Sequence, residues 1–145
     1  MKKSRRKSRE YALKGLYQWK VTGDSADVIE RQLQEDEEFG KADDVHFAGL
    51  LRGAIAQSQD LDQRLTPYLD RPAAELSPIE HAVLLLAAFE LVNHPEIPYR
   101  VVINEAVELA KSYGGTDGHK YVNGVVDKLA AQVRAVEIQG AGARG

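Results

Sequence analysis

Residues 76–91 read LSPIEHAVLLLAAFEL, and this stretch predicts a helix that is buried on nearly every side. Ser77 at the N-cap, Pro78 in the first turn and Glu80 at the third position form a capping box with a pre-set first turn. The residues that follow are almost all apolar, so the helix has no solvent-facing stripe. A helix with that pattern belongs at the centre of a core. The sequence therefore predicts a fold arranged around this segment.

Helical periodicity also dominates on the N-terminal side of this segment, and no stretch alternates as a β-strand should. We expect a first helix that ends at Gly23 and a second one capped by Asp24 or Ser25. After an acidic connector at 35–44, one long helix is expected over 45–65. Its inward stripe comprises Phe47, Leu51, Ala54, Ser58, Leu61 and Leu65.

The C-terminal side begins with a break, since Pro67 and Pro72 interrupt the helical pattern near the middle of the chain. Pro98 then starts a helix that Gly114-Gly115 stops, because glycine adopts the left-handed conformation at little cost. Thr116 or Asp117 is expected to cap the last helix. The expected core positions of these two helices are Val102, Ala106, Leu109 and Ala110, then Val122, Val125, Val126, Leu129 and Val133.

The resulting prediction is an all-α protein of about seven helices, forming a single domain over residues 1–139 with a flexible tail at 140–145. The length of 145 residues and the 43% apolar share are those of one globular domain. Cysteine is absent, which excludes disulfides and thiolate metal sites. The basic N-terminus lacks the apolar run of a secretory signal, and the longest apolar run (82–89) is too short to cross a bilayer. We therefore expect a cytoplasmic protein.

Charge is distributed unevenly along the chain. The first twenty residues contain eight Lys or Arg and one Glu, a formal charge of +7, whereas the whole chain carries −3 and the remainder therefore −10. A basic arm (about residues 1–10) on an acidic body indicates local contact with a polyanion. Arginine-rich arms often become ordered only on RNA, and the aromatic residues Tyr11, Tyr17 and Trp19 follow it. The alternative is a disordered arm that only aids solubility.

A second candidate site lies at residues 113–123, YGGTDGHKYVN. A helix N-terminus offers free N–H groups to a phosphate, Lys120 adds charge, and Tyr121 adds a face for stacking. The alternative is a capped turn with a solvated lysine, in which Asp117 serves as the N-cap and disfavours an anion. The sequence leaves both interpretations open.

Catalysis is not indicated. The sequence has no Gly-rich phosphate loop, zinc-ligand spacing or nucleophile elbow, and adjacent residues such as Glu80 and His81 do not face each other on a helix. We expect no cofactor and no metal, because the histidines at 46, 81, 94 and 119 share no ligand spacing. Glu80 has either the capping role alone or a second role facing a basic partner protein.

Three blocks in order resemble the NusB family of bacterial transcription antitermination factors: RRKSREYALKGLYQW (5–19), LSPIEHAVLLLAAFEL (76–91) and IPYRVVINEAVELAKSYGGTDGHKYVNGVVDKLA (97–130). The resemblance implies two small helical bundles packed across one another. It also implies a heterodimer with NusE, a small-subunit ribosomal protein, that binds boxA RNA of rRNA leader transcripts. That heterodimer would join NusA and NusG on RNA polymerase to prevent premature termination.

Carried onto this chain, the resemblance implies that Glu80 faces NusE. It also implies an RNA site made of the arm, the first helix and the turn, comprising Lys2, Arg5, Arg6, Arg9, Tyr17, Asp117, His119, Lys120 and Tyr121. Two other functions remain alternatives: a detached rRNA-targeting module of a methyltransferase system, and a helical scaffold that binds only protein. Monomer and homodimer are both compatible with the sequence.

Overall fold

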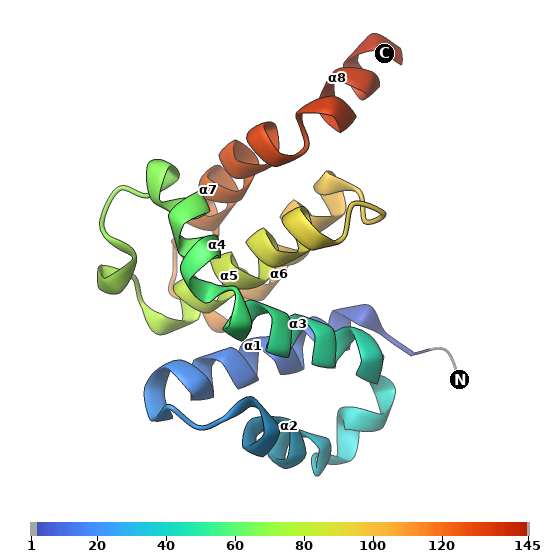
Figure 1. Cartoon of the computed structure of the whole chain (residues 1–145), viewed down its shortest axis with the longest axis vertical. Helices are drawn as coiled ribbons and strands as arrows, with labels where there is room; N and C mark the ends of the chain where they lie inside the picture. The colour runs from blue at the N-terminus through green and yellow to red at the C-terminus, as the bar shows by residue number, and fades with distance from the viewer. Residues whose placement is uncertain (1–2, 145) are drawn as a thin grey trace.

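The computed structural model describes residues 3–144. All the regular secondary-structure elements in this range are α-helices or 3-10 helices (Figure 1). The expected all-α fold is confirmed, with eight α-helices in the described chain in place of about seven. They are α1 (Arg5–Thr22), α2 (Ala26–Gln34), α3 (Asp44–Ala56), α4 (Ser58–Leu65), α5 (Pro78–Asn93), α6 (Tyr99–Tyr113), α7 (Gly118–Val133) and α8 (Ala135–Arg144). Short 3-10 turns occupy Glu37–Lys41, Thr66–Tyr68 and Ala73–Glu75 in the connectors.

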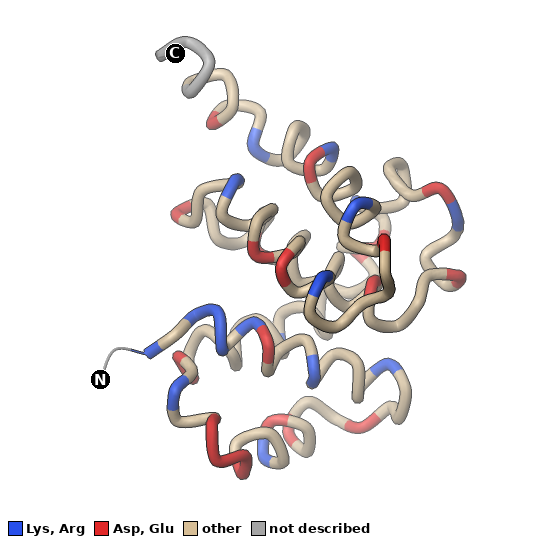
Figure 2. The backbone as a smooth tube through the Cα atoms, turned by 180° about the vertical axis from the view of Figure 1, so that it is seen from behind, with Lys and Arg blue, Asp and Glu red and all other residues tan. Residues whose placement is uncertain are grey.

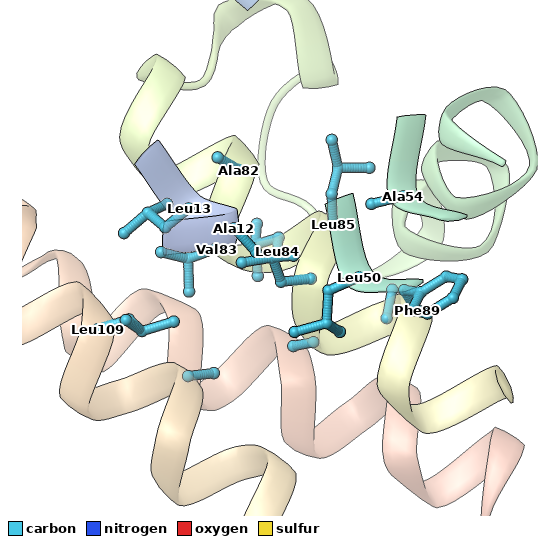
Figure 3. Packing of buried hydrophobic residues seen from close by; sticks show 14 of the residues in the cluster. Ala12, Leu13, Leu50, Ala54, Ala82, Val83, Leu84, Leu85, Phe89 and Leu109 are labelled. Carbon is cyan, nitrogen blue, oxygen red and sulfur yellow. The ribbon is translucent and has the colours of Figure 1, made fainter. Parts of the chain in front are cut away.

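Helix α5 is the centre of the molecule, as its sequence predicts. Every residue from His81 to Leu91 is buried. The helix packs against α1 and α3 on one side and against α4, α6 and α7 on the other. Figure 3 shows α5 side chains such as Leu84 and Phe89 among residues of α1 and α3. Helices α1–α3 thus form one group and α4, α6 and α7 a second, joined through α5 (Figure 1).

The start of α5 follows the capping pattern. The backbone N–H of Glu80 donates to Ser77 Oγ at 3.1 Å, and Pro78 occupies the first turn. At the end of α1, Gly23 adopts φ +75° and donates its N–H to the Trp19 carbonyl, which confirms the predicted stop. Ser25 caps α2 through its side chain.

The expected long helix over 45–65 is wrong: the chain bends at Gln57 and forms α3 and α4. The bend sends the two halves to different neighbours, since α3 packs on α1 whereas α4 packs on α5 and α7. The two halves stay in phase, so Phe47 and Leu51 on α3 and Leu61 and Leu65 on α4 are all buried. Because the apolar spacing continues unchanged through the bend, the sequence does not indicate that a bend is present.

The stop at Gly114 is confirmed in position but not in conformation. Gly114 has φ −94° and ψ −175°, which is extended backbone rather than the left-handed conformation expected. Glycine is favoured there by space, because a Cβ at this position would lie 2.7 Å from the Ala110 carbonyl oxygen.

The helix expected to be the last is followed by another. Helix α7 ends at Val133, and α8 continues to Arg144 after a break at Arg134. The buried Arg134 guanidinium donates to the carbonyl oxygens of Leu91, Ile97 and His94, and so ties the α7–α8 junction to the end of α5. The flexibility of residues 140–145 stays a prediction. In the described chain, no helix has the length and apolar character needed to cross a membrane.

Candidate nucleic-acid interface

The basic arm is attached to the body of the protein from Lys3 onward. Lys3 Nζ donates to the Gly40 carbonyl, and the Ser4 N–H donates to the Lys41 carbonyl at 2.8 Å. The Ser4 side chain also caps α1 by accepting from the Lys7 N–H. A disordered tail therefore does not describe residues 3–10. Lys2, which is among the expected RNA contacts, lies outside the described residues.

Arg5 and Arg6 are exposed residues in the first turn of α1. Figure 2 shows that Lys and Arg gather at this end of the chain. The Arg6 side chain is 64% exposed and makes two hydrogen bonds to the Glu105 carboxylate of α6, at 3.0 and 3.1 Å. This pair raises the pKa of Arg6, chiefly through the hydrogen bond to Glu105. The Glu105 carboxylate engages Nε and Nη2 of Arg6, and it therefore competes with a phosphate for this guanidinium.

Arg9 was expected among the RNA contacts, but the structure places it in the interior. Its side chain is 6% exposed and donates to both Glu90 oxygens, at 2.8 and 3.0 Å. His46 Nε2 lies 3.0 Å from the same carboxylate. Burial alone would raise the pKa of Glu90, but the hydrogen bonds from His46 and Arg9 outweigh it and hold the pKa below its ordinary value. Arg9 therefore joins α1 to α5 and is not accessible to RNA.

The aromatic residues of α1 differ in the same way. Tyr17 is 42% exposed, so it is accessible, and its contact with RNA stays a prediction. Tyr11 is buried, its ring packs edge-on against Phe39, and its hydroxyl donates to Asp36 at 2.8 Å. Burial raises the pKa of Tyr11, and the bond to Asp36 adds to that shift. Trp19 is partly buried and packs against the core.

The turn between α6 and α7 presents charge at the start of α7. Asp117 occupies the N-cap position, but its side chain makes no capping hydrogen bond, which contradicts the capped-turn interpretation in that detail. Instead, its carboxylate lies 3.5 Å from Lys120 Nζ, and both side chains are exposed. His119 is half-buried beside them. The exposed face of this turn therefore carries one cation next to one anion.

Tyr121 contacts Asp70 and Arg71, two residues that the sequence does not indicate as part of this site. Its hydroxyl accepts from the Asp70 N–H at 3.2 Å, and the Arg71 guanidinium lies 5.5 Å from its ring centre. Burial raises the pKa of Tyr121. The stacking face expected for a base is thus in contact with Arg71, which adds a second exposed cation beside the turn. The link to Asp70 could not be read from sequence, because these residues are brought together only by folding.

Glu80 lies against the start of α7. A Cβ on Gly118 would come within 2.6 Å of Glu80 Oε1, so glycine leaves the space that this carboxylate fills. A negative charge is favoured at a helix N-terminus, which gives Glu80 a structural role beyond the start of α5. The side chain remains half-buried, and Arg71 is near enough that Glu80 contributes to raising the pKa of Arg71.

The arm and the turn lie at the two ends of a surface formed by α1 and α6. The two helices run in the same direction, because Arg6 pairs with Glu105 and, further along both helices, Glu10 shares a hollow with Ser112. Tyr17 lies twelve positions after Arg5 on α1, a rise of about 18 Å. Between the two ends lie acids of both helices, Glu10, Glu105 and Glu108. Residues 3–144 contain no group of three or more side chains arranged to hold a metal ion.

Comparison with known proteins resolves the family. A model of the NusB family matches residues 6–131. The chain belongs to the NusB family. Among NusB relatives, the transcription antitermination protein NusB of Nitrosomonas eutropha is 59% identical over 138 residues, covering 95% of this chain and 83% of the relative. That of Paraburkholderia phytofirmans is 57% identical over 141 residues, covering 97% and 98%.

Solved NusB structures share the fold. T. maritima NusB superposes with a TM-score of 0.79 at 34% identity, covering 90% of this chain and 92% of that one. A chain in the crystal structure of antitermination factors NusB and NusE in complex with dsRNA gives a TM-score of 0.80 at 23% identity, covering 88% and 96%.

Proposed function

We propose that this protein is a transcription antitermination factor that binds boxA-type RNA of rRNA leader transcripts together with NusE. The observation that carries the proposal is the surface of α1 and the α6–α7 turn, where Arg5, Arg6 and Lys120 are exposed cations and Tyr17 of α1 is an exposed aromatic residue. Two NusB relatives that match nearly the whole chain bear the antitermination name. A structural neighbour that contains NusB, NusE and dsRNA supports the choice of partner.

The proposed RNA contacts divide by chemistry. Arg5, Arg6 and Lys120 would neutralise phosphates, and Lys2 would extend the arm. Tyr17 would stack on a base, since base–aromatic stacking tolerates any sequence. His119, Asp117 and Tyr121 would contact the nucleotide at the turn, where an acid can accept from a base amino group. Arg9 is left out of this set because it is buried against Glu90.

The acids between the two ends of this surface restrict where an RNA strand can contact the protein. Glu10, Glu105 and Glu108 repel phosphates along the α1–α6 hollow, so the strand is expected to contact the protein at the arm and at the turn. Binding at two separated points favours an RNA strand that can reach both the arm and the turn. It disfavours non-specific binding of other polyanions. The acidic body thereby limits contact to this surface.

The proposed role is non-enzymatic and cytoplasmic, with NusA, NusG and RNA polymerase joining the larger complex. NusE would dock at the α5–α7 corner marked by Glu80 and extend the RNA surface. A detached targeting module of a methyltransferase system and a protein-only scaffold are the competing functions. The first predicts methyl transfer to rRNA in a reconstituted system, and the second predicts a partner complex that ignores RNA.

The test is a fluorescence anisotropy titration of boxA RNA and of a scrambled RNA, each with and without NusE. We expect tighter binding of boxA than of the scrambled strand, and a further increase when NusE is present. Equal affinity for both RNAs with and without NusE would reject sequence-specific binding. A duplex of the same sequence serves as a third arm and shows whether the site takes single or paired strands.

The partner surface is tested separately with Glu80→Gln. Loss of the carboxylate charge is expected to weaken NusE binding, whereas Glu30→Gln on α2 should leave it unchanged. Both variants keep a side chain of nearly the same size. Thermal unfolding of Glu80→Gln shows whether the contact with the α7 start is also lost. Unchanged NusE affinity in a folded Glu80→Gln protein would remove Glu80 from the partner surface.

A further inference from the structure

A Lys–His–Asp cluster lies in an open pocket of about 390 Å³ formed by α1, α4 and α5, and the proposed RNA site does not use it. Lys20 Nζ lies 2.5 Å from His81 Nδ1, and His81 Nε2 lies 2.6 Å from Asp62 Oδ1. The three side chains come from three different helices, so folding alone assembles them. The pocket is lined by Trp19, Lys20, Ser58, Asp62, His81 and Leu85.

The geometry fixes the hydrogen-bonding role of the imidazole. A carboxylate oxygen accepts hydrogen bonds, so we place the imidazole proton on His81 Nε2, which donates to Asp62 Oδ1. The unprotonated Nδ1 then faces the Lys20 amine. This is the arrangement in which a carboxylate orients a histidine so that the histidine can take a proton from a nucleophile. His81 is itself nearly buried, with 9% of its side chain exposed, which holds the ring in place.

The environment of Lys20 also favours the neutral amine. The side chain is half-buried beside Trp19. Burial lowers the pKa of Lys20, and the charge of Asp62 opposes this only in part. A larger fraction of neutral amine makes a lysine a better nucleophile.

We propose that Lys20 is a site of direct acylation by small activated acyl donors, acyl phosphates or acyl thioesters, with His81 as the base and Asp62 as its positioning residue. His81 Nδ1 takes a proton from the Lys20 ammonium, and the freed amine attacks the acyl carbon. The new N–C bond forms as the C–O bond to phosphate, or the C–S bond of the thioester, breaks. Phosphate or thiolate leaves with the electron pair, and the remaining surplus proton on nitrogen passes to water.

The product is a neutral amide in place of a cation. Acylated Lys20 could no longer donate as an ammonium to His81, and the acyl group would occupy part of the pocket. The reaction requires no oxidant and no bound cofactor.

Site-resolved mass spectrometry tests the proposal on the intact protein. Samples are incubated with acetyl phosphate or, in a parallel arm, with acetyl coenzyme A, and the acetylation rate of each lysine is followed. Lys14 is the matched internal control, because it is an exposed lysine of the same helix and lies over the Tyr11 ring rather than beside a histidine. We expect Lys20 to react at least about tenfold faster than Lys14, a small part of the roughly 10²–10⁴-fold that a positioned base can supply. The reagent that gives this excess rate, acetyl phosphate or acetyl coenzyme A, identifies the class of acyl donor.

Two variants separate base assistance from simple accessibility. His81→Gln keeps one donor and one acceptor but cannot take the proton, and it should lower the Lys20 rate to that of Lys14. Asp62→Asn leaves His81 in place and should lower the Lys20 rate while leaving the Lys14 rate unchanged. Circular dichroism melting checks that each variant is folded. Lys20 reacting no faster than Lys14 in the wild-type protein, or keeping its excess rate in folded Asp62→Asn, would overturn the proposal.

Discussion

Arg6 and Arg9 lie three residues apart on α1 and have opposite environments. Arg6 pairs with Glu105 at the surface, where water and salt screen the interaction. Arg9 and Glu90 are both buried, and His46 Nε2 also contacts the Glu90 carboxylate. Removing one partner of an exposed pair costs little, but removing one partner of a buried pair leaves a charge without compensation. The two arginines thus differ in role: Arg6 is a proposed RNA contact, whereas Arg9 contributes to stability.

Arg9→Ala is expected to lower the free energy of unfolding by about 3–5 kcal/mol, because Glu90 stays buried with only His46 beside it. Arg6→Ala should lower it by about 0–1 kcal/mol. Urea denaturation of both variants measures the difference. Similar small losses for the two variants would contradict the buried ion pair.

Glu90 is expected to contribute to acid unfolding. Its pKa is lower in the folded protein than in the unfolded chain, so the unfolded state binds the proton more tightly. The stabilisation is complete above the unfolded value of about 4.3 and is lost as the pH falls through the lower folded value. Unfolding free energies measured from pH 6 to pH 3 should decline more steeply for wild type than for Glu90→Gln. Parallel curves would rule out Glu90 as a source of the acid sensitivity.

At the scale of elements, several helix ends can be predicted from capping residues that are close together in the sequence. The bends between helices cannot be predicted in this way. Ser77, Ser25 and Gly23 act where capping chemistry predicts. Gln57 and Arg134 mark bends that carry no such signature. At Arg134 the bend is stabilised by distant carbonyls of the α5–α6 connector, so its cause lies outside the segment that bends.

Gly23→Ala should isolate the cost of the left-handed turn. Nothing lies within 4 Å of a Cβ built at Gly23, so packing does not contribute, and the φ of +75° is the only obstacle. The expected loss is about 1–2 kcal/mol of unfolding free energy, with Gly23→Asn costing less. Gly40→Ala is the matched control, because it also meets no neighbour and has no positive φ. Equal effects at Gly23 and Gly40 would contradict this interpretation.

At the scale of the whole molecule, charge separation is the feature that the proposed function depends on. The basic end of α1 is attached to a body with an excess of acids, and the acids nearest to it line the α1–α6 hollow. Binding to RNA through this end releases counterions from the strand, so the affinity should fall as salt rises.

Arg5→Ala and Arg6→Ala are each expected to reduce the slope of log affinity against log salt for boxA RNA by about 0.7, the value for one phosphate contact on a single strand. Arg6→Ala should show the smaller loss of affinity at low salt, since the Glu105 carboxylate already offsets part of the charge of wild-type Arg6. Arg31→Ala on α2 is the control cation and should leave the slope unchanged. A slope that is unchanged in both arm variants would remove the arm from the RNA site.

The sequence by itself determined the helical class, the central position of α5 and the helix ends at Gly23, Ser25, Ser77 and Gly114. These properties depend on residues that are close together in the chain, on capping groups and on apolar periodicity, and they need no knowledge of distant contacts. It also placed the basic arm and the α6–α7 turn as candidate sites, since charge and turn chemistry are local. The role of each residue within them could not be derived in the same way.

Only the tertiary structure decided which cations face solvent and which groups meet. Arg6 and Arg9 are alike in sequence, but the approach of α5 encloses one and leaves the other exposed. The same packing brings Asp70 to Tyr121, Glu80 to Gly118, and Lys20 to His81 and Asp62. Burial and long-range pairing depend on how helices pack in three dimensions, and periodicity along one helix does not specify which partner covers each face.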